Sequence, residues 1–341
     1  MAHPRPTTVG ALATVTVGIA FAAVLLGGSL RPSTLVWTGP IGPSYPIVVR
    51  DFGSAHLGST TGRDAQQYYA IASEFPHIHQ VVPYLDSPRY RLLRILEPVL
   101  ASLAPRGAPI ILTTLALNIV GVGLAAFSLA TLGPRIGLRT WTGYAAGATL
   151  LPAVVQSTPD SLATGFALLG LMWSVRGRHW HAVATLVLAA MTRETTIVVA
   201  AVCGIVTVVG GRSLWPGISY ATPAAAIGGW YLYLGTVTTA PLPHEFELLG
   251  ITKLSFGEFA LAAALFVISV AGAWRWRREP AVGGAAAIFG AWMLVQRPDS
   301  LLFDSAPRVF SFAITVAGVA VAGWSGAVLS RFRHPTRARP A

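Results

Sequence analysis

Apolar runs that approach or exceed the length needed to cross a membrane recur along the whole chain, and this pattern constrains the fold most. A helix needs about 20 mainly apolar residues to cross the hydrocarbon core. Of the 341 residues, 53% are hydrophobic and only 11% are charged, too few polar side chains for the surface of a water-soluble protein of this size. The sequence therefore predicts an all-α, polytopic transmembrane helical bundle, with residues 1–341 forming a single domain.

About ten helices are expected to span the membrane, joined by short Arg-rich or Pro/Gly-rich connections. The first apolar run is too long and too uniform for a signal peptide, and no small-x-small cleavage motif precedes Arg31. We therefore expect this helix to be retained as an anchor. The predicted spans are 9–30, 108–132, 140–156, 161–175, 182–192, 195–210, 218–235, 257–274, 281–296 and 309–330.

The arginines set the expected orientation, because short cytoplasmic loops carry an excess of Lys and Arg. With the N-terminus inside, one alternate set of connections and the tail hold most of the arginines. These are Arg135, Arg139, Arg176, Arg178, Arg212, Arg275, Arg277, Arg278, Arg331, Arg333, Arg337 and Arg339. The segment 182–210 is either one long helix or a short hairpin broken at residues 192–195, and the positive-inside rule favours the hairpin. The arginine pattern predicts a multi-pass protein of a bacterial cytoplasmic (inner) membrane, with both termini cytoplasmic.

Twelve of the thirteen acidic residues then fall on the outer side. They are Asp51, Asp64, Glu74, Asp86, Glu97, Asp160, Glu194, Glu245, Glu247, Glu258, Asp299 and Asp304; Glu279 alone is inside. Carboxylates drawn from separate connections onto one face indicate a polar site there. The net charge of +11 is interpreted as anchoring to anionic membrane lipid, and no nucleic-acid partner is expected.

The one long hydrophilic segment, 31–107, is expected to be an outer loop carrying interfacial helices. Its first part, 31–63, is rich in Pro, Gly, Ser and Thr, which indicates an irregular path. Residues 64–75 show an apolar-aromatic face at helical spacing, with Asp64 placed as an N-cap. A second amphipathic helix is predicted in 85–105, with Arg91, Arg94 and Glu97 as one charged stripe and Pro98 kinking or ending it.

The order of these features resembles the bacterial polytopic branch of the GT-C superfamily of membrane glycosyltransferases. The resemblance rests on a first helix, a long outer loop with interfacial helices, and the motifs DxQxYYxIA (64–72), YRxxRIxxP (90–98) and TRET (192–195). It covers roughly residues 45–200 and the arrangement of helices beyond. The chain departs from the family in having Asp-Ala-Gln at 64–66 where Asp-Gly-Gln is expected, and in lacking a paired Asp-x-Asp motif.

The resemblance implies inverting sugar transfer on the outer face, from a polyprenyl-phosphate sugar donor to a cell-envelope acceptor, glycan or protein. It also implies an acidic residue early in the first outer loop as the base. Asp64 is the candidate, and Asp51 is the alternative. Glycosyl transfer needs a carboxylate to accept the hydroxyl proton and a cation to stabilise the departing phosphate. The competing interpretations are that Asp64 only caps its helix and that Asp51 is only a solvated loop residue.

Five residues are candidates for substrate binding. Arg91 and Arg94 could hold the donor phosphate, or could only extend from an interfacial helix to the surface. Asp160 could line the site or stabilise the start of its helix. Arg193 and Glu194 are neighbours that cannot face each other on one helix, so an intrahelical ion pair does not explain them. Ionisable residues at membrane depth are typical of functional sites.

The sequence alone decides neither whether a metal is needed nor whether the protein is an enzyme. A divalent metal is compatible with the chemistry, but no metal motif is present: the His77-x-His79 pair has no adjacent third ligand. A transporter or flippase of a lipid-linked glycan and a non-catalytic membrane subunit of envelope assembly are the alternatives to an enzyme. A transporter is expected to carry charged or broken helices at the midplane, and the predicted spans hold few polar groups there.

Overall fold

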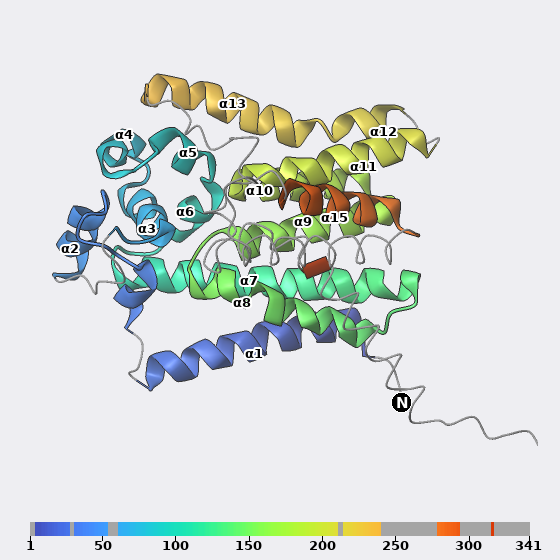
Figure 1. Ribbon diagram of the computed structural model, residues 1–341, viewed down its shortest axis with the longest axis horizontal. Coiled ribbons are helices and arrows are strands. Elements are labelled where there is room, and N and C mark those ends of the chain that lie inside the picture. The colour runs from blue at the N-terminus through green and yellow to red at the C-terminus, as the bar shows by residue number, and fades with distance from the viewer. Residues whose placement is uncertain are drawn as a thin grey trace, which may run out of the picture.

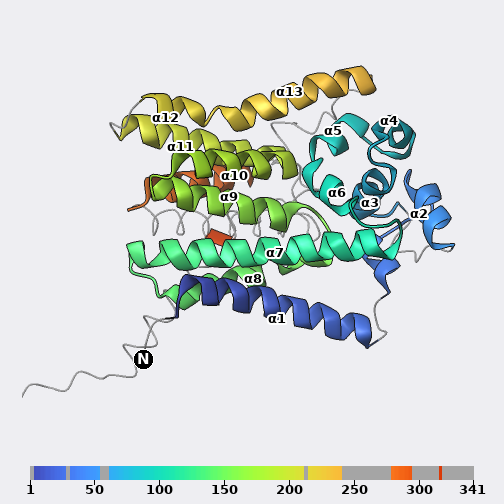
Figure 2. The same ribbon diagram turned by 180° about the vertical axis from the view of Figure 1, so that it is seen from behind.

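Long apolar helices lie side by side and form a bundle in the computed structural model, which describes residues 4–27, 31–53, 61–210, 214–239, 278–293 and 315–316 (Figures 1 and 2). All regular elements in these ranges are helical, which confirms the all-α class. The long helices are α1 (Pro6–Leu26), α7 (Ala108–Leu132), α8 (Ala145–Val155), α9 (Asp160–Val175), α10 (His179–Thr192), α11 (Ile197–Val209), α13 (Thr222–Val237) and α15 (Pro280–Met293).

The described helices match the predicted spans closely where both exist. Helix α7 has the bounds that were expected, and the 140–156 span is divided into the 3-10 helix η4 (Thr140–Tyr144) and α8. Two stretches, Pro6–Leu26 and Ala108–Ile136, are long and apolar enough to cross a membrane by length and composition. The expected span 257–274, and 309–330 apart from residues 315–316, lie outside the described residues.

The expected break between 192 and 195 is present. Helix α10 ends at Thr192, Arg193 has extended backbone angles (φ −154°, ψ 116°), and the short 3-10 helix η5 (Glu194–Thr196) leads into α11. The chain reverses here, since His179 at the start of α10 contacts Tyr220, which lies beyond the far end of α11. This confirms that the segment is a hairpin and not one long helix.

Short helices from the 31–107 segment gather at one end of the bundle (Figure 1). They are η1 (Pro32–Val36), α2 (Tyr45–Phe52), α3 (Asp64–Glu74), α4 (Ile78–Val81), η2 (Val82–Tyr84), α5 (Pro88–Leu93) and α6 (Leu96–Ala101). The expectation of an irregular path over 31–63 is wrong for 45–52, because Pro46 suits the first turn of a helix and Ile47 and Val48 are buried against the rest of this end.

The segment 85–105 forms two helices and not one. Helix α5 ends at Leu93, Arg94 leaves the helical region (φ −93°, ψ 57°), and α6 begins at Leu96 with Pro98 in its first turn. A proline has no N–H to donate to the carbonyl four residues earlier, and its ring clashes with that carbonyl. The carbonyl in question belongs to Arg94, so the break falls four residues before the place that was expected.

Helix α3 is enclosed on all sides. The apolar face predicted for it is buried, and so are the polar residues on its other sides, which find partners on neighbouring segments. Gln66 donates to the carbonyl of Thr61 at 2.8 Å, Gln67 donates to Asp86 at 2.6 Å, and Ser73 donates to Asp51 at 2.9 Å. A buried polar group needs such a partner, so these bonds fix the position of α3 and of Asp64 at its start.

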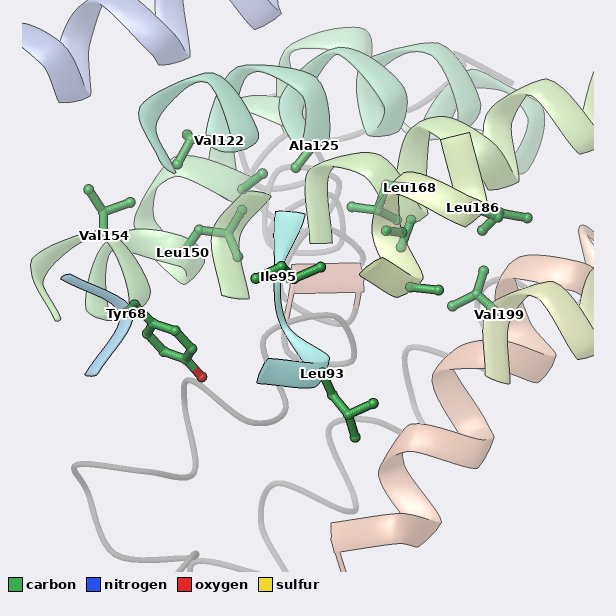
Figure 3. Packing of buried hydrophobic residues seen from close by; sticks show 14 of the residues in the cluster. Tyr68, Leu93, Ile95, Val122, Ala125, Leu150, Val154, Leu168, Leu186 and Val199 are labelled. Carbon is green, nitrogen blue, oxygen red and sulfur yellow. The ribbon is translucent and has the colours of Figure 1, made fainter. Parts of the chain in front are cut away.

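A single apolar core connects this end to the bundle (Figure 3). Tyr68, Leu93 and Ile95 from the short helices belong to the same cluster as Val122 of α7 and Leu168 of α9. Helices α7 and α9 approach closely at two glycines: a Cβ added to Gly165 would lie 2.5 Å from the Gly121 carbonyl oxygen. Small residues allow this contact between helices, and it brings the start of α9 next to the middle of α7.

The charged residues divide between the two ends of the bundle. Helices α7 and α9 both lead away from the end that holds α2–α6, so the arginines that follow them lie at the opposite end. There Arg135, in the 3-10 helix η3 (Gly133–Ile136), contacts Glu279 just before α15 at 3.3 Å. Asp51, Asp64, Glu74, Asp86, Glu97, Asp160 and Glu194 belong to the α2–α6 end.

Candidate functional site

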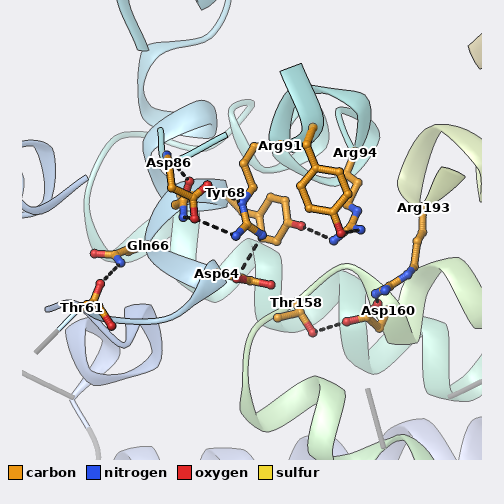
Figure 4. Close-up of polar contacts among 12 residues, drawn as sticks. Thr61, Asp64, Gln66, Tyr68, Asp86, Arg91, Arg94, Thr158, Asp160 and Arg193 are labelled. Atoms are coloured by element: carbon orange, nitrogen blue, oxygen red, sulfur yellow. Dashed lines mark hydrogen bonds and ion pairs between the residues drawn. The ribbon is translucent and has the colours of Figure 1, made fainter. Parts of the chain in front are cut away.

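Asp64 and Asp86 both bind the guanidinium group of Arg91 (Figure 4). Arg91 Nε and Nη2 donate to the two oxygens of Asp86, each at 2.9 Å, and Nη1 lies 3.0 Å from Asp64 Oδ1. Asp64 is the first residue of α3, and Arg63 occupies the N-cap position at which Asp64 was expected. The Asp64 side chain keeps 20% of its surface exposed, so this carboxylate is paired and still reachable.

Arg94 and Glu194 form a bidentate ion pair, with Nε and Nη2 of Arg94 each 2.9 Å from a carboxylate oxygen. The remaining donors of Arg94 contact the hydroxyl groups of Tyr68, at 3.0 Å, and Tyr90. The break of the chain at Arg94 directs this side chain toward η5. The expected stripe of Arg91, Arg94 and Glu97 is therefore wrong, since the three residues have three different partners.

Arg193 and Asp160 form a further ion pair, between Nη1 and Oδ1. The other oxygen of Asp160 accepts a hydrogen bond from the Thr158 hydroxyl at 2.7 Å. Asp160 is the first residue of α9 and is 1% exposed, while Arg193 is 6% exposed. Within the described residues, Arg193 Nε has no hydrogen-bond partner, so this buried cation retains one unused donor.

These ion pairs, made by three arginines with four carboxylates, lie together and are called the ionic cluster below. It consists of Asp64, Asp86, Arg91, Arg94, Asp160, Arg193 and Glu194. Tyr68 lies between Arg91 and Arg94 in Figure 4, and its hydroxyl accepts a hydrogen bond from Arg94 Nη1 at 3.0 Å. The predicted residues Asp64, Arg91, Arg94, Asp160, Arg193 and Glu194 are thus brought to one place from α3, α5, α9 and the α10–α11 hairpin.

Asp51 belongs to a different network. It lies in α2, its side chain is 7% exposed, and it accepts hydrogen bonds from Arg50 Nε at 2.8 Å, Tyr69 Oη at 2.7 Å and Ser73 Oγ at 2.9 Å. The idea of a solvated loop aspartate is therefore wrong. Burial raises the pKa of Asp51, but the hydrogen bonds outweigh burial and hold the pKa below its ordinary value. A carboxylate stabilised in this way is a poor base.

Several residues of this region were missed by the sequence interpretation. Asp86 binds the same arginine, Arg91, as Asp64 does. The Tyr68 and Tyr90 hydroxyl groups accept further hydrogen bonds from Arg94. A usable signal was present, because Tyr68 and Tyr90 lie within the two motifs that carry the family resemblance. Burial raises the pKa of Asp86, and the Arg91 guanidinium outweighs burial and holds that pKa below its usual value.

Glu97 of α6 is buried in a separate polar contact with α7. Its Oε1 accepts a hydrogen bond from Asn118 of α7, whose Oδ1 in turn accepts from Ser161 of α9 at 2.9 Å. Glu97 therefore pairs with Asn118 and not with Arg94, its neighbour on the expected stripe. Glu97 is 1% exposed, and its Oε2 has no hydrogen-bond partner among the described residues. Burial raises the pKa of Glu97 to about 8, with the Asn118 hydrogen bond acting in the opposite direction.

The described residues contain no group of three or more His, Cys, Asp or Glu side chains placed to hold a metal ion. His77 and His79 are both exposed, with ring centres 6.3 Å apart. Cys203 is buried in α11 as an unpaired thiol. From the sequence, six residues of later connections could contact an acceptor or could only be solvated loop residues, and all six lie outside the described residues. These are His244, Glu245, Glu247, Asp299, Asp304 and Arg308.

Comparison of the chain with protein-family models, with curated proteins and with solved structures found no match.

Proposed function

We propose that the chain is an integral membrane glycosyltransferase of the GT-C type that takes its sugar from a polyprenyl-phosphate-linked donor. The observation that carries the proposal is the ionic cluster, in which the partly exposed carboxylate of Asp64 lies with the guanidinium groups of Arg91, Arg94 and Arg193. Nucleotide sugars do not reach the outer face of a membrane, whereas a lipid carrier delivers an activated sugar directly to a membrane-embedded site.

The membrane placement follows from the bundle and its charges. Apolar side chains of α1 that face away from the core are exposed, among them Leu12 at 53% and Ile19 at 64%, and contiguous apolar surface of this kind marks contact with another apolar phase. Among the described residues, the carboxylates other than Glu279 lie at the α2–α6 end, and Arg135, Arg139, Arg176 and Arg178 lie in the short connections at the opposite end. The positive-inside rule assigns such connections to the cytoplasmic face. We infer about ten spans, with both termini cytoplasmic and the ionic cluster on the outer side.

The proposed reaction moves one proton and breaks one bond. The acceptor hydroxyl oxygen attacks the anomeric carbon of the sugar, its proton passes to Asp64, and the bond from that carbon to the phosphate oxygen breaks with inversion. The electron pair leaves with the polyprenyl phosphate, whose growing charge the guanidinium groups stabilise. Asp64 is assigned over Asp51 because Asp51 is saturated by hydrogen bonds and lies in another network.

The phosphate has specific donors to engage. Arg193 Nε is buried without a hydrogen-bond partner in the described part of the chain. Glu194 accepts a bidentate pair of hydrogen bonds from Arg94 Nε and Nη2. A guanidinium binds a phosphate in the same bidentate geometry. We infer that the donor phosphate contacts Arg193 Nε and competes with Glu194 for Arg94, so Arg94→Lys is expected to weaken donor binding because a lysine cannot make the two-pronged contact.

The experiment is transfer by the purified full chain in lipid vesicles. Radiolabelled polyprenyl-phosphate sugars and the matching nucleotide sugars are supplied with an envelope-lipid extract, and both glycosylated acceptor and released polyprenyl phosphate are measured. Turnover with a lipid-linked donor and none with the nucleotide sugar is expected. Absence of turnover with every lipid-linked donor would refute the proposal. Movement of the donor across the bilayer without bond cleavage would indicate a flippase instead.

A further inference from the structure

A second site-like feature lies at the opposite end of the bundle from the ionic cluster. A cavity of about 990 Å³ is lined by the turn between α9 and α10, by the first turn of α10, by α12 (Leu214–Ser219) and by the start of α13. Helix α12 lies away from α2–α6 in both views (Figures 1 and 2). Ligand pockets range from roughly 300 to 1,000 Å³, so this groove has room for a substantial ligand.

The polar side of the groove is basic. Arg178, His179 and His181 line it, and its lining contains no Asp or Glu. The Arg178 guanidinium lies 5.3 Å from the Trp173 ring centre, which fixes its direction without neutralising its charge. Glu279, at the same end of the bundle, forms its ion pair with Arg135 and is not part of the groove lining. The groove therefore presents a positive charge and imidazole N–H groups to a ligand.

The rest of the lining is apolar and faces outward. Trp180 is 77% exposed, Trp215 is 78% exposed and Ile218 is 49% exposed. Tryptophan is enriched where helices leave the hydrocarbon, because its ring is apolar and its N–H is polar. Arg178 lies next to two exposed tryptophans at the end of apolar helices. This end of the bundle therefore combines a positive charge with apolar surface, as expected of a protein surface at the level of the lipid headgroups.

We propose that this groove binds an anionic phospholipid of the cytoplasmic leaflet, with its phosphate on Arg178 and His181 and an acyl chain along Trp180, Trp215 and Ile218. A soluble anion would use only the basic side, and a zwitterionic lipid would gain less from Arg178. An anionic lipid matches both the charge and the apolar lining. The inference rests on the proposed membrane placement and is independent of sugar transfer.

The test measures lipid retention by the full-length protein in detergent. The protein is titrated with phosphatidylglycerol or with phosphatidylcholine of the same acyl chains, and bound lipids are counted by native mass spectrometry. Preferential retention of phosphatidylglycerol by about tenfold is expected. The Arg178→Gln, His181→Gln double variant should lose that preference, and Arg139→Gln, which removes an exposed arginine at the same end outside the groove, should keep it. Both substitutions in the double variant are at exposed positions, so folding should be maintained.

Two further measurements identify the source of the phosphate and the role of the tryptophans. Excess inorganic phosphate should leave the phosphatidylglycerol bound, because it cannot use the apolar lining. The Trp180→Ala, Trp215→Ala variant should retain less of both lipids. Equal retention of the two lipids, an unchanged preference in the Arg178→Gln, His181→Gln protein, or displacement of the lipid by inorganic phosphate would each overturn the proposal.

Discussion

Arg94 and Glu194 are 100 residues apart in sequence and meet through two parallel hydrogen bonds of 2.9 Å. The Arg94 side chain is 4% exposed and that of Glu194 is 20% exposed. This pair joins the short helices at the end of the bundle to the tip of the α10–α11 hairpin. A buried pair of this kind costs desolvation, and removing one partner leaves an uncompensated charge.

Glu194→Gln is therefore expected to lower the stability of the protein strongly, on the order of 3–5 kcal/mol. The measurement is the thermal unfolding midpoint in detergent. Arg135→Gln is the matched control, because it breaks an ion pair whose arginine is 46% exposed and should change stability by less than about 1 kcal/mol. Similar shifts in the two variants would show that the Arg94–Glu194 pair has no special structural role.

Glu97→Gln is expected to change the pH dependence of stability. The folded protein holds the pKa of Glu97 at about 8, above the ordinary value of 4.5. Stability from the protonated group is fully present below pH 4.5 and is lost as pH rises toward 8. At pH 7 the loss is roughly 3 kcal/mol.

The variant cannot ionise at residue 97, so its stability relative to the parent should rise across this pH range. Unfolding midpoints measured from pH 5 to pH 8 give the comparison, and other titrating groups cancel in the difference. Parallel profiles for the two proteins would show that Glu97 does not titrate in this range.

Asp51→Asn should act on stability more than on chemistry. The carboxylate accepts from Arg50, Tyr69 and Ser73 and so joins α2 to α3, and a charged hydrogen bond contributes about 1.5–3 kcal/mol. Its lowered pKa means that this contribution is present above about pH 3.8 and is lost as pH falls below it. A lower unfolding midpoint at pH 7, and a parent-to-variant difference that shrinks in acid, are expected. An unchanged midpoint would contradict the structural role.

The positions of the long helices could be predicted from sequence because apolar run length and helix length are directly related. The break at Arg193 was also predictable, since only a hairpin there keeps the later arginines on the cytoplasmic side. The break at Arg94 was missed, although the cause was visible. Pro98 excludes the carbonyl of Arg94 from a helix, and the break therefore comes four residues before the proline itself.

The candidate site was predictable only as a list of residue types. Spacing placed Arg91, Arg94 and Glu97 on one stripe, which assumed a continuous helix. The actual partners, Asp64, Glu194 and Asn118, come from distant segments. Sequence spacing carries no information about such contacts, because they depend on how the helices pack. The motifs that carry the resemblance to GT-C enzymes contain residues of the ionic cluster, but they do not indicate how those residues pair.

Topology is testable without activity. Reporter fusions after Arg135 and after Pro298 are expected to read cytoplasmic and outer, respectively, because the first follows α7 at the end opposite α2–α6 and the second lies beyond α15. Pro298 itself is outside the described residues. A fusion after Pro76, next to α3, should also read outer. The same side for Arg135 and Pro298 would contradict the proposed number of spans between them.

Asp64→Asn is expected to abolish sugar transfer while leaving folding and membrane insertion intact. An asparagine cannot accept the acceptor proton, and loss of a general base slows a reaction by about 10²–10⁴-fold. If Asp64 served only to start α3, asparagine would do so almost as well, because its side-chain oxygen also accepts from backbone N–H groups. Transfer from the lipid-linked donor and the unfolding midpoint are both measured.

Asp86→Asn is the matched control, because Asp86 binds the same guanidinium as Asp64 and makes the closer two-pronged contact with it. If Asp64 acted only by holding Arg91 in place, replacing Asp86 should reduce transfer at least as much. A large loss in Asp64→Asn alone therefore assigns the base, since the two variants disturb Arg91 similarly but only one removes the proton acceptor. Equal losses would reduce Asp64 to a positioning residue, and full activity in Asp64→Asn would exclude it from the mechanism.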